Sequence, residues 1–239
     1  AVARNIGAVK AKGNILLFVD SDIALNKDVL RRMIENFENK NIAAVCGVYS
    51  KEPLIDDGLV EQYRTLQEHY WKCSTAGYIS SMILSIGAIK KDVFFEFDGL
   101  DENYKKPDVE DIEFGNRITR KYKIFMDKNI QGRHDSDDKL FIIMRNIAKR
   151  AGQRVKLFAK RKKFDNQYAT PNRGFGVVFA LGLLIALILS GFFPRAFAVA
   201  ALFLFGFLLS DFGMYFFVAR EKGALFLLYF IGVHFFVNL

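Results

Sequence analysis

The sequence predicts an α/β fold with a mainly parallel sheet, followed by a helical region that crosses a membrane. Over residues 1–138, short apolar runs of strand length alternate with segments of helical period, as in folds whose helices cover a parallel sheet. From residue 174 to residue 239 the sequence is almost unbroken in its apolar character, which is typical of membrane-spanning helices. The charged residues of this last part are Arg195, Asp211, Arg220, Glu221 and Lys222.

The expected elements follow from hydrophobic period and from punctuating residues. Residues 2–10 place Val2, Ile6 and Val9 on one helical face, and residues 15–19 form an apolar run typical of a buried strand. The chain has no initial Met and opens within this helix, so we expect a longer protein whose first strand or strands precede it. The further expected elements are a helix over 27–38 capped by Asn26, a strand over 42–49, a helix over 58–72, an extended segment over 79–89, helices over 92–97 and 109–122, and a strand over 123–126.

A basic segment over residues 139–173 joins these two parts. It alternates Lys and Arg with apolar side chains and contains one acid, Asp165. A helix of this kind suits the interface of an anionic membrane surface, and packing on the preceding domain is the alternative. Three transmembrane helices are predicted over 175–193, 196–219 and 224–239. The positive-inside rule then puts the first domain on the cytoplasmic face.

Composition narrows the range of partners. The net charge is +8 at pH 7, but no motif that reads nucleic acid accompanies it, so no nucleic-acid partner is expected. Cys46 and Cys73 lack the spacing of metal ligands and are expected to be reduced packing residues. Asp211 lies within a predicted span, where an acid is either buried for a function or directed to the membrane surface.

The stretch ILLFVDSD, residues 15–22, runs from a buried strand into two acids. Ligands of open α/β sheets bind beyond the carboxyl ends of the strands. Asp20 and Asp22 would repel each other there unless a cation lies beside them, and Mg²⁺ or Mn²⁺ takes oxygen ligands and bridges to phosphates. The pair therefore indicates metal-assisted handling of a phosphorylated substrate, with helix capping or a polar loop as the alternative.

Two stretches carry a resemblance to a known family. ARNIGAVKAKGNILLFVDSD and SIGAIKKDVFFEFDGLDENYKKPDVEDIEFGNRI resemble the nucleotide-sugar and acceptor regions of family 2 glycosyltransferases, which have the GT-A fold. The resemblance covers about residues 3–134, and membrane-anchored members of the family also carry C-terminal spans. The Q-x-x-R-W motif of the processive polysaccharide synthases is missing from the sequence, which favours transfer of single sugars.

The resemblance implies a donor site with a metal. Asp22 would ligate Mg²⁺ or Mn²⁺ beside the donor diphosphate, and Asp20 would contact the ribose or the metal. Arg4 would line the nucleotide pocket. His134 would complete the metal site, although a single His is more commonly a surface or packing residue.

The resemblance also implies catalytic residues. Asp111 would be the general base, with Glu110 beside it shaping the site, and capping of the following helix is the alternative for both acids. Two further pairs are candidates: Asp101 and Glu102 as acceptor contacts, and Arg150 and Arg154 as diphosphate contacts. Lipid headgroups are the alternative target of these two arginines.

Together these features predict a membrane-anchored, inverting glycosyltransferase with a cytoplasmic catalytic domain. Its partners would be a nucleotide-diphosphate sugar, an acceptor hydroxyl on a lipid-linked or cell-envelope glycan, and anionic lipid headgroups. Two alternatives stay open. One is a polyprenyl-phosphate glycosyltransferase, whose ionised acceptor needs no base, and the other is a membrane-anchored binding domain without catalysis.

Overall fold

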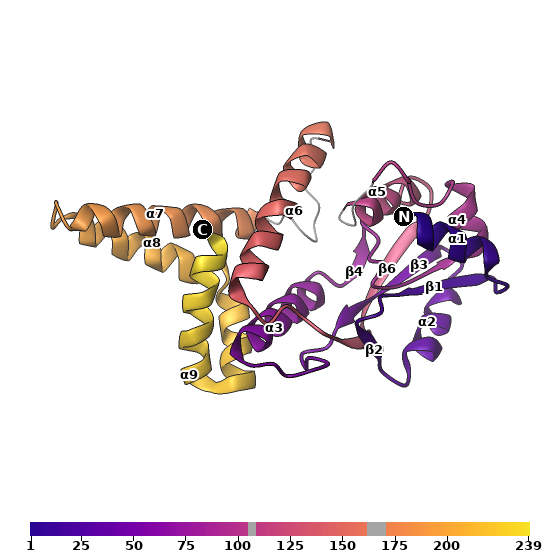
Figure 1. Ribbon diagram of the computed structural model, residues 1–239, viewed down its shortest axis with the longest axis horizontal. Coiled ribbons are helices and arrows are strands. Elements are labelled where there is room, and N and C mark those ends of the chain that lie inside the picture. The colour runs from indigo at the N-terminus through magenta and orange to yellow at the C-terminus, as the bar shows by residue number, and fades with distance from the viewer. Residues whose placement is uncertain (105–108, 162–170) are drawn as a thin grey trace. The chain divides into compact units, whose positions relative to one another are not determined.

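The computed structural model describes residues 1–104, 109–161 and 171–239 (Figure 1), with side chains over 1–104, 109–152 and 173–239. The chain folds as two compact units, Ala1–Gln167 and Tyr168–Leu239. The basic helix predicted after residue 138 belongs to the first unit. The predicted division at residues 138 and 173 stays a prediction.

The first unit alternates strands and helices much as the sequence predicts. The predicted strands over 15–19 and 42–49 have the observed bounds, whereas the extended segment over 79–89 is divided into two strands and the last strand is longer than expected. The elements in order are α1 (Val2–Lys10), β1 (Ile15–Val19), β2 (Ile23–Leu25), α2 (Val29–Phe37), β3 (Ile42–Tyr49), α3 (Leu59–Ser74), β4 (Gly77–Ile79), β5 (Ile86–Lys90), α4 (Lys91–Glu96), α5 (Glu110–Ile118), β6 (Lys123–His134) and α6 (Leu140–Arg161).

The prediction of a mainly parallel sheet is wrong. The sheet has six strands in the order β1-β5-β3-β6-β2, with β4 also paired to β6, and within the described residues only the β3–β6 pairing is parallel. Strands β1, β3 and β6 do run in the same direction, as the alternation with helices implies. Strand β5 is inserted antiparallel between β1 and β3, and the short strands β2 and β4 both pair antiparallel to β6.

Buried side chains pack on both faces of the sheet. Alternate residues of β3 point to opposite faces, so Cys46 shares a buried cluster with Phe94 of α4, whereas Val45 packs with Met33 of α2. Residues of α1 and α5 complete the first cluster. Burial on both faces explains the continuous apolar sequence of β3. Cys46 and Cys73 are free thiols, as predicted.

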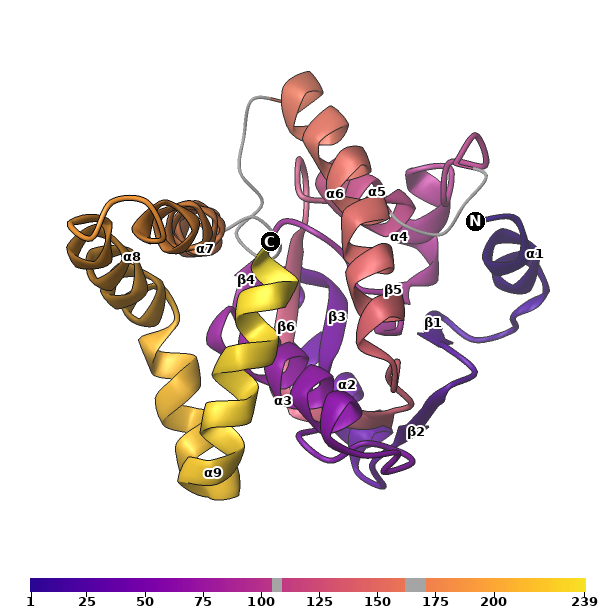
Figure 2. The same cartoon turned by 60° about the vertical axis from the view of Figure 1, so that its left-hand side comes forward.

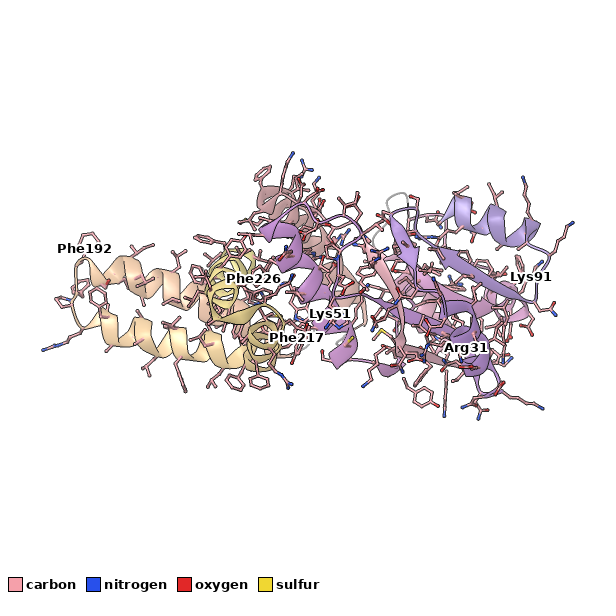
Figure 3. All side chains as sticks on the ribbon, turned by 90° about the horizontal axis from the view of Figure 1, so that it is seen from below. Arg31, Lys51, Lys91, Phe192, Phe217 and Phe226 are labelled. Atoms are coloured by element: carbon pink, nitrogen blue, oxygen red, sulfur yellow. The ribbon has the colours of Figure 1, made fainter. Side chains whose placement is uncertain are left out.

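The second unit consists of apolar helices. It contains α7 (Pro171–Ser190), α8 (Ala196–Ser210) and α9 (Phe212–Asn238). Phe192 lies exposed at the turn between α7 and α8 (Figure 3). By length and composition, one described helix, Arg173–Ser190, could cross a membrane, or two if the bent pair α8–α9 counts as one span.

The predicted spans over 196–219 and 224–239 are not two straight helices. The chain bends by 71° between α8 and α9 at Asp211, and Gly223, with φ of 82°, divides α9 into two arms (Figures 1 and 2). The Asp211 carboxylate lies 3.1 Å from Nε2 of His234, whose side chain is buried, and the Asp211 side chain is 9% exposed. Of the two alternatives for this acid, the described side chains therefore favour burial with a partner.

We predict that Gly115→Ala destabilises the first unit. Helix α5 packs so closely on the chain before β5 that a methyl group at Gly115 would lie 2.1 Å from the backbone nitrogen of Met82. Relieving this overlap requires a backbone shift, so the free energy of unfolding should fall by about 2 kcal/mol or more. Chemical denaturation followed by circular dichroism measures the change.

Gly7→Ala is the matched control for this substitution. Gly7 also lies in a helix, α1, but a methyl group at this position would meet no atom within 4 Å. Since Ala favours a helix over Gly, stability should stay equal or rise by about 0.5–1 kcal/mol. Equal stability of both variants would contradict the packing argument.

Candidate active site

Polar and charged side chains gather where β1, β3 and β6 end. These strands run in the same direction, so their carboxyl ends lie at one edge of the sheet. Asp20 and Asp22 follow β1, Tyr49 ends β3, and His134 ends β6. The fold therefore brings together residues that are far apart in the sequence.

The pairing of β2 with β6 places Asp22 beside His134. Ile23 pairs with His134, and the backbone N–H of Asp135 donates to the carbonyl of Asp22 over 3.0 Å. As a result, Nε2 of His134 lies 3.6 Å from Oδ2 of Asp22. The other ring nitrogen, Nδ1, lies 3.0 Å from Oγ of Ser136. If Nδ1 carries the hydrogen, the lone pair of Nε2 is directed toward Asp22.

A buried acid on α3 holds the loop after His134. Glu61 of α3 is fully buried, and it accepts hydrogen bonds from the backbone N–H groups of Ser136, over 3.1 Å, and Asp57, over 2.7 Å. These two bonds hold the loop that carries Ser136, whose hydroxyl group is the hydrogen-bond partner of His134.

The Asp22 carboxylate and the His134 imidazole are suitable as the protein ligands of Mg²⁺ or Mn²⁺. Mg²⁺ and Mn²⁺ sites commonly use one or two protein ligands and take the rest from substrate phosphates and water, and Asp22 with His134 supplies such a pair. In the part of the chain that the structure describes, no three His, Cys, Asp or Glu side chains are grouped to hold a metal. The third predicted ligand, Asp20, is directed to Arg4 instead, at 2.6 Å.

Arg4 connects the two predicted halves of the site. Its guanidinium donates to Asp20 over 2.6 Å and to Glu110 over 3.3 Å. The Glu110 side chain is only 3% exposed, and a buried carboxylate is stable only when it is paired and hydrogen-bonded. Arg4 therefore joins the end of β1 to the start of α5.

The predicted acceptor residues lie in a turn that Asn5 holds. The Asn5 side chain accepts from the N–H of Leu100 over 3.0 Å and donates to its carbonyl over 2.8 Å. It also donates to Glu102 over 2.9 Å, while Asp101 accepts from the backbone and side chain of Asn103. Both acids therefore have local partners, and their role as acceptor contacts stays a prediction.

Asp111 is a half-buried carboxyl group at the start of α5. Its Oδ1 accepts from the backbone N–H of Ile112 over 2.8 Å. Burial, and then the negative charge of Glu110, raise the pKa of Asp111 to about 7, against the opposing effects of the Ile112 bond and Arg4. A carboxyl group with this pKa can gain and lose a proton near neutral pH, as a general base must.

Helix α3 adds residues that the sequence analysis did not nominate. Nδ1 of His69 donates to the carbonyl of Tyr49 over 2.7 Å, and Nζ of Lys72 lies 3.1 Å from the centre of the Tyr49 ring. Burial lowers the pKa of Lys72 to about 8, against the charge of nearby Glu68. Tyr49 and Lys72 end the predicted strand and helix, so their positions near the site edge could have been inferred from these ends.

The two arginines proposed for the diphosphate lie on α6. Arg150 is exposed, and it is one of several positive charges acting on Glu68 of α3. Burial opposes ionisation of Glu68, but nearby positive charges, of which Arg64 and Lys72 have the largest effects, outweigh it and lower the pKa of Glu68. The side chain of Arg154 lies outside the described residues, so its role stays a prediction.

A known protein family matches most of the chain. The family model described as glycosyltransferase-like family 2 matches residues 1–169. No match was found among curated proteins.

Two solved structures match part or all of the chain. One is the mannosyltransferase PcManGT from Pyrobaculum calidifontis, in complex with GDP-Man and Mn²⁺, with a TM-score of 0.50, 13% identity, and coverage of 100% of this chain and 64% of that one. The other is A197 from STIV, with a TM-score of 0.34, 16% identity, and coverage of 58% of this chain and 66% of that one. The chain thus spans about two thirds of either structure, and the first likeness supports the fold alone.

We predict that Asp111→Asn stabilises the protein in a pH-dependent way. The native pKa is raised from 3.8 to about 7, so the native state favours the protonated carboxyl and loses this advantage as the pH rises through about 7. The stability gain of the variant should therefore be small near pH 4, grow up to about pH 7 and then level off. Denaturation curves over this pH range measure the gain.

Asp138→Asn is the matched control, because Asp138 is exposed on the loop after β6. Solvent surrounds this carboxylate in both the folded and unfolded states, so its replacement should change the free energy of unfolding by less than about 0.5 kcal/mol. A gain for Asp111→Asn that is independent of pH would contradict the assigned shift.

Proposed function

The chain belongs to the glycosyltransferase-like family 2, and from this premise we propose that it is a membrane-anchored, inverting glycosyltransferase. It moves a sugar from a nucleotide-diphosphate sugar to a hydroxyl group of a lipid-linked or cell-envelope glycan. The observation that carries the proposal is the arrangement of the acids at the sheet edge. Asp22 and His134, the metal ligands of this proposal, lie at the strand ends. Asp111, a carboxyl with pKa of about 7, is joined to that edge through Glu110, Arg4 and Asp20.

The donor lies at the strand ends in this proposal. Asp22 and His134 would hold Mg²⁺ or Mn²⁺, and the ion would supply positive charge against the diphosphate leaving group. Asp20 contacts the ribose while Arg4 holds its carboxylate in place. The mannosyltransferase of similar fold was solved with GDP-Man and Mn²⁺, and this supports a nucleotide sugar as the class of donor.

The acceptor is activated at the start of α5. A carboxylate oxygen of Asp111 takes the proton of the acceptor hydroxyl while the hydroxyl oxygen forms a bond to the anomeric carbon. The bond from that carbon to the diphosphate oxygen breaks on the opposite face, so the configuration inverts. Burial, and then the negative charge of Glu110, keep Asp111 basic enough to accept the proton. Arg4 in turn neutralises Glu110, so the buried acids stay compatible with the fold.

Anchoring rests on the second unit and the basic segment before it. Helix α7 is apolar and long enough to cross a bilayer. Arg145, Lys149 and Arg150 on α6 are exposed and suit anionic headgroups. These features support a catalytic domain on the cytoplasmic face, beside a lipid-linked acceptor.

A polyprenyl phosphate is the alternative acceptor. Its phosphate is already ionised and needs no base, whereas the raised pKa of Asp111 gives the site a proton acceptor. The hydroxyl acceptor is therefore favoured. A binding domain without catalysis is the second alternative, and it requires no turnover of any nucleotide sugar.

A donor screen tests the proposal. The full protein in detergent, given a panel of nucleotide sugars with Mn²⁺ or Mg²⁺, should release one nucleotide diphosphate in a metal-dependent manner. Asp22→Asn should abolish the release, and Asp111→Asn should lower kcat by about 100-fold or more. In the wild-type protein kcat/KM should rise with pH through about 7, because Asp111 must be ionised.

Asp138→Asn serves as the control with an exposed acid and should retain wild-type turnover. Turnover of a polyprenyl phosphate at a near-normal rate by Asp111→Asn would refute the assignment of the base. Release that needs neither a metal nor Asp22 would refute the donor site.

A further inference from the structure

A column of three side chains stands behind the Asp22–His134 pair. The ring of Tyr49 is stacked on the ring of His134, with centroids 4.4 Å apart and planes at 3°. The ammonium of Lys72 lies over the Tyr49 ring at 3.1 Å from its centroid. Beyond His134, Oδ2 of Asp22 lies 3.6 Å from Nε2. The order is therefore Lys72, Tyr49, His134 and Asp22.

Lys72 and His134 must lie on opposite faces of the Tyr49 ring. A parallel ring at 4.4 Å and an ammonium at 3.1 Å from the same centroid would overlap if they shared one face. Tyr49 is thus held between a cation and an imidazole. A cation over the face of an aromatic ring is attracted to the ring, and the attraction is stronger when the contact is shielded from water.

The column is anchored on α3 at two points. His69 donates from Nδ1 to the carbonyl of Tyr49 over 2.7 Å, and Lys72 follows three residues later on the same helix. A neutral ring offers an electron-rich face to Lys72 without adding a charge beside the metal pair.

We propose that Tyr49 and Lys72 are positioning residues for the metal ligand His134. Ser136 fixes the imidazole at Nδ1, and the Tyr49 ring fixes the plane of the imidazole, so that Nε2 faces Asp22. Lys72 holds the Tyr49 ring from behind. The inference rests on the metal site of the proposed function. Partners that orient a ligating His commonly change metal affinity by about 10–100-fold.

Mn²⁺ affinity of the full protein in detergent, measured by electron paramagnetic resonance without any sugar donor, tests the inference. Tyr49→Leu removes the ring and should weaken Mn²⁺ binding by about 10-fold. Tyr49→Phe keeps the ring and should bind within about twofold of the wild type. Lys72→Met should weaken binding by a few fold, and Lys72→Arg, which can also stack on the ring, should restore it.

A double-mutant cycle with His134→Ala separates positioning from general damage. In the His134→Ala background, Tyr49→Leu should cause no further loss, because the ring acts only through His134. Wild-type affinity in Tyr49→Leu, an equal loss in the His134→Ala background, or no Mn²⁺ binding by the wild-type protein would each overturn the inference. If Tyr49→Leu does not fold, the comparison of Lys72→Met with Lys72→Arg decides.

The outcome is distinguishable from failure of the proposed function. Ring-dependent Mn²⁺ binding with no turnover of any nucleotide sugar would leave the inference standing and refute the transferase. Turnover of a nucleotide sugar, with a Mn²⁺ affinity that does not depend on Tyr49, would support the transferase and refute the inference.

Discussion

The two ion pairs of Arg4 are the constraint on which the candidate site depends. Asp20 and Glu110 are separated by most of the first unit in sequence, and Glu110 lies beside a second acid, Asp111. Without a nearby cation, burial of the Glu110 carboxylate beside Asp111 would be strongly unfavourable. Arg4 lowers this electrostatic cost while leaving Asp111 with a raised pKa. One guanidinium thus stabilises the fold and permits a base at neutral pH.

The local part of the fold could be predicted from the sequence, whereas the strand pairing could not. The apolar runs over 15–19 and 42–49 are both strands. The run over 42–49 is buried because its side chains pack on both faces of the sheet. The run over 15–19 is not a buried strand as predicted: β1 stands at the end of the described strand order, and only Leu16 in it is buried. The alternation with helices correctly implies that β1, β3 and β6 share a direction. It carries no information on whether a later strand enters between them, as β5 does. The three residues of β2 are too few to show a period, yet they place Asp22 beside His134.

The site shows the same division between local and distant effects. The sequence shows that Glu110 and Asp111 are adjacent, so the upward effect of the Glu110 charge on the pKa of Asp111 could be predicted. The larger effect is burial, which depends on packing from other elements. Asp22 and His134 could be nominated by resemblance. The positions of Tyr49 and Lys72 could be inferred from the ends of the predicted strand and helix. Their contact could not, because a stack of a cation on a ring has no characteristic spacing along the chain.

The central claim is that a divalent cation is held between Asp22 and His134, with a nucleotide diphosphate completing its shell. Diffraction from crystals grown with Mn²⁺ and the donor nucleotide, collected at an energy where manganese scatters anomalously, tests this claim most directly. The account predicts one anomalous peak within about 2.5 Å of Asp22 Oδ2 and His134 Nε2. A Mn²⁺ peak coordinated elsewhere, with these two side chains free of the ion, would contradict it.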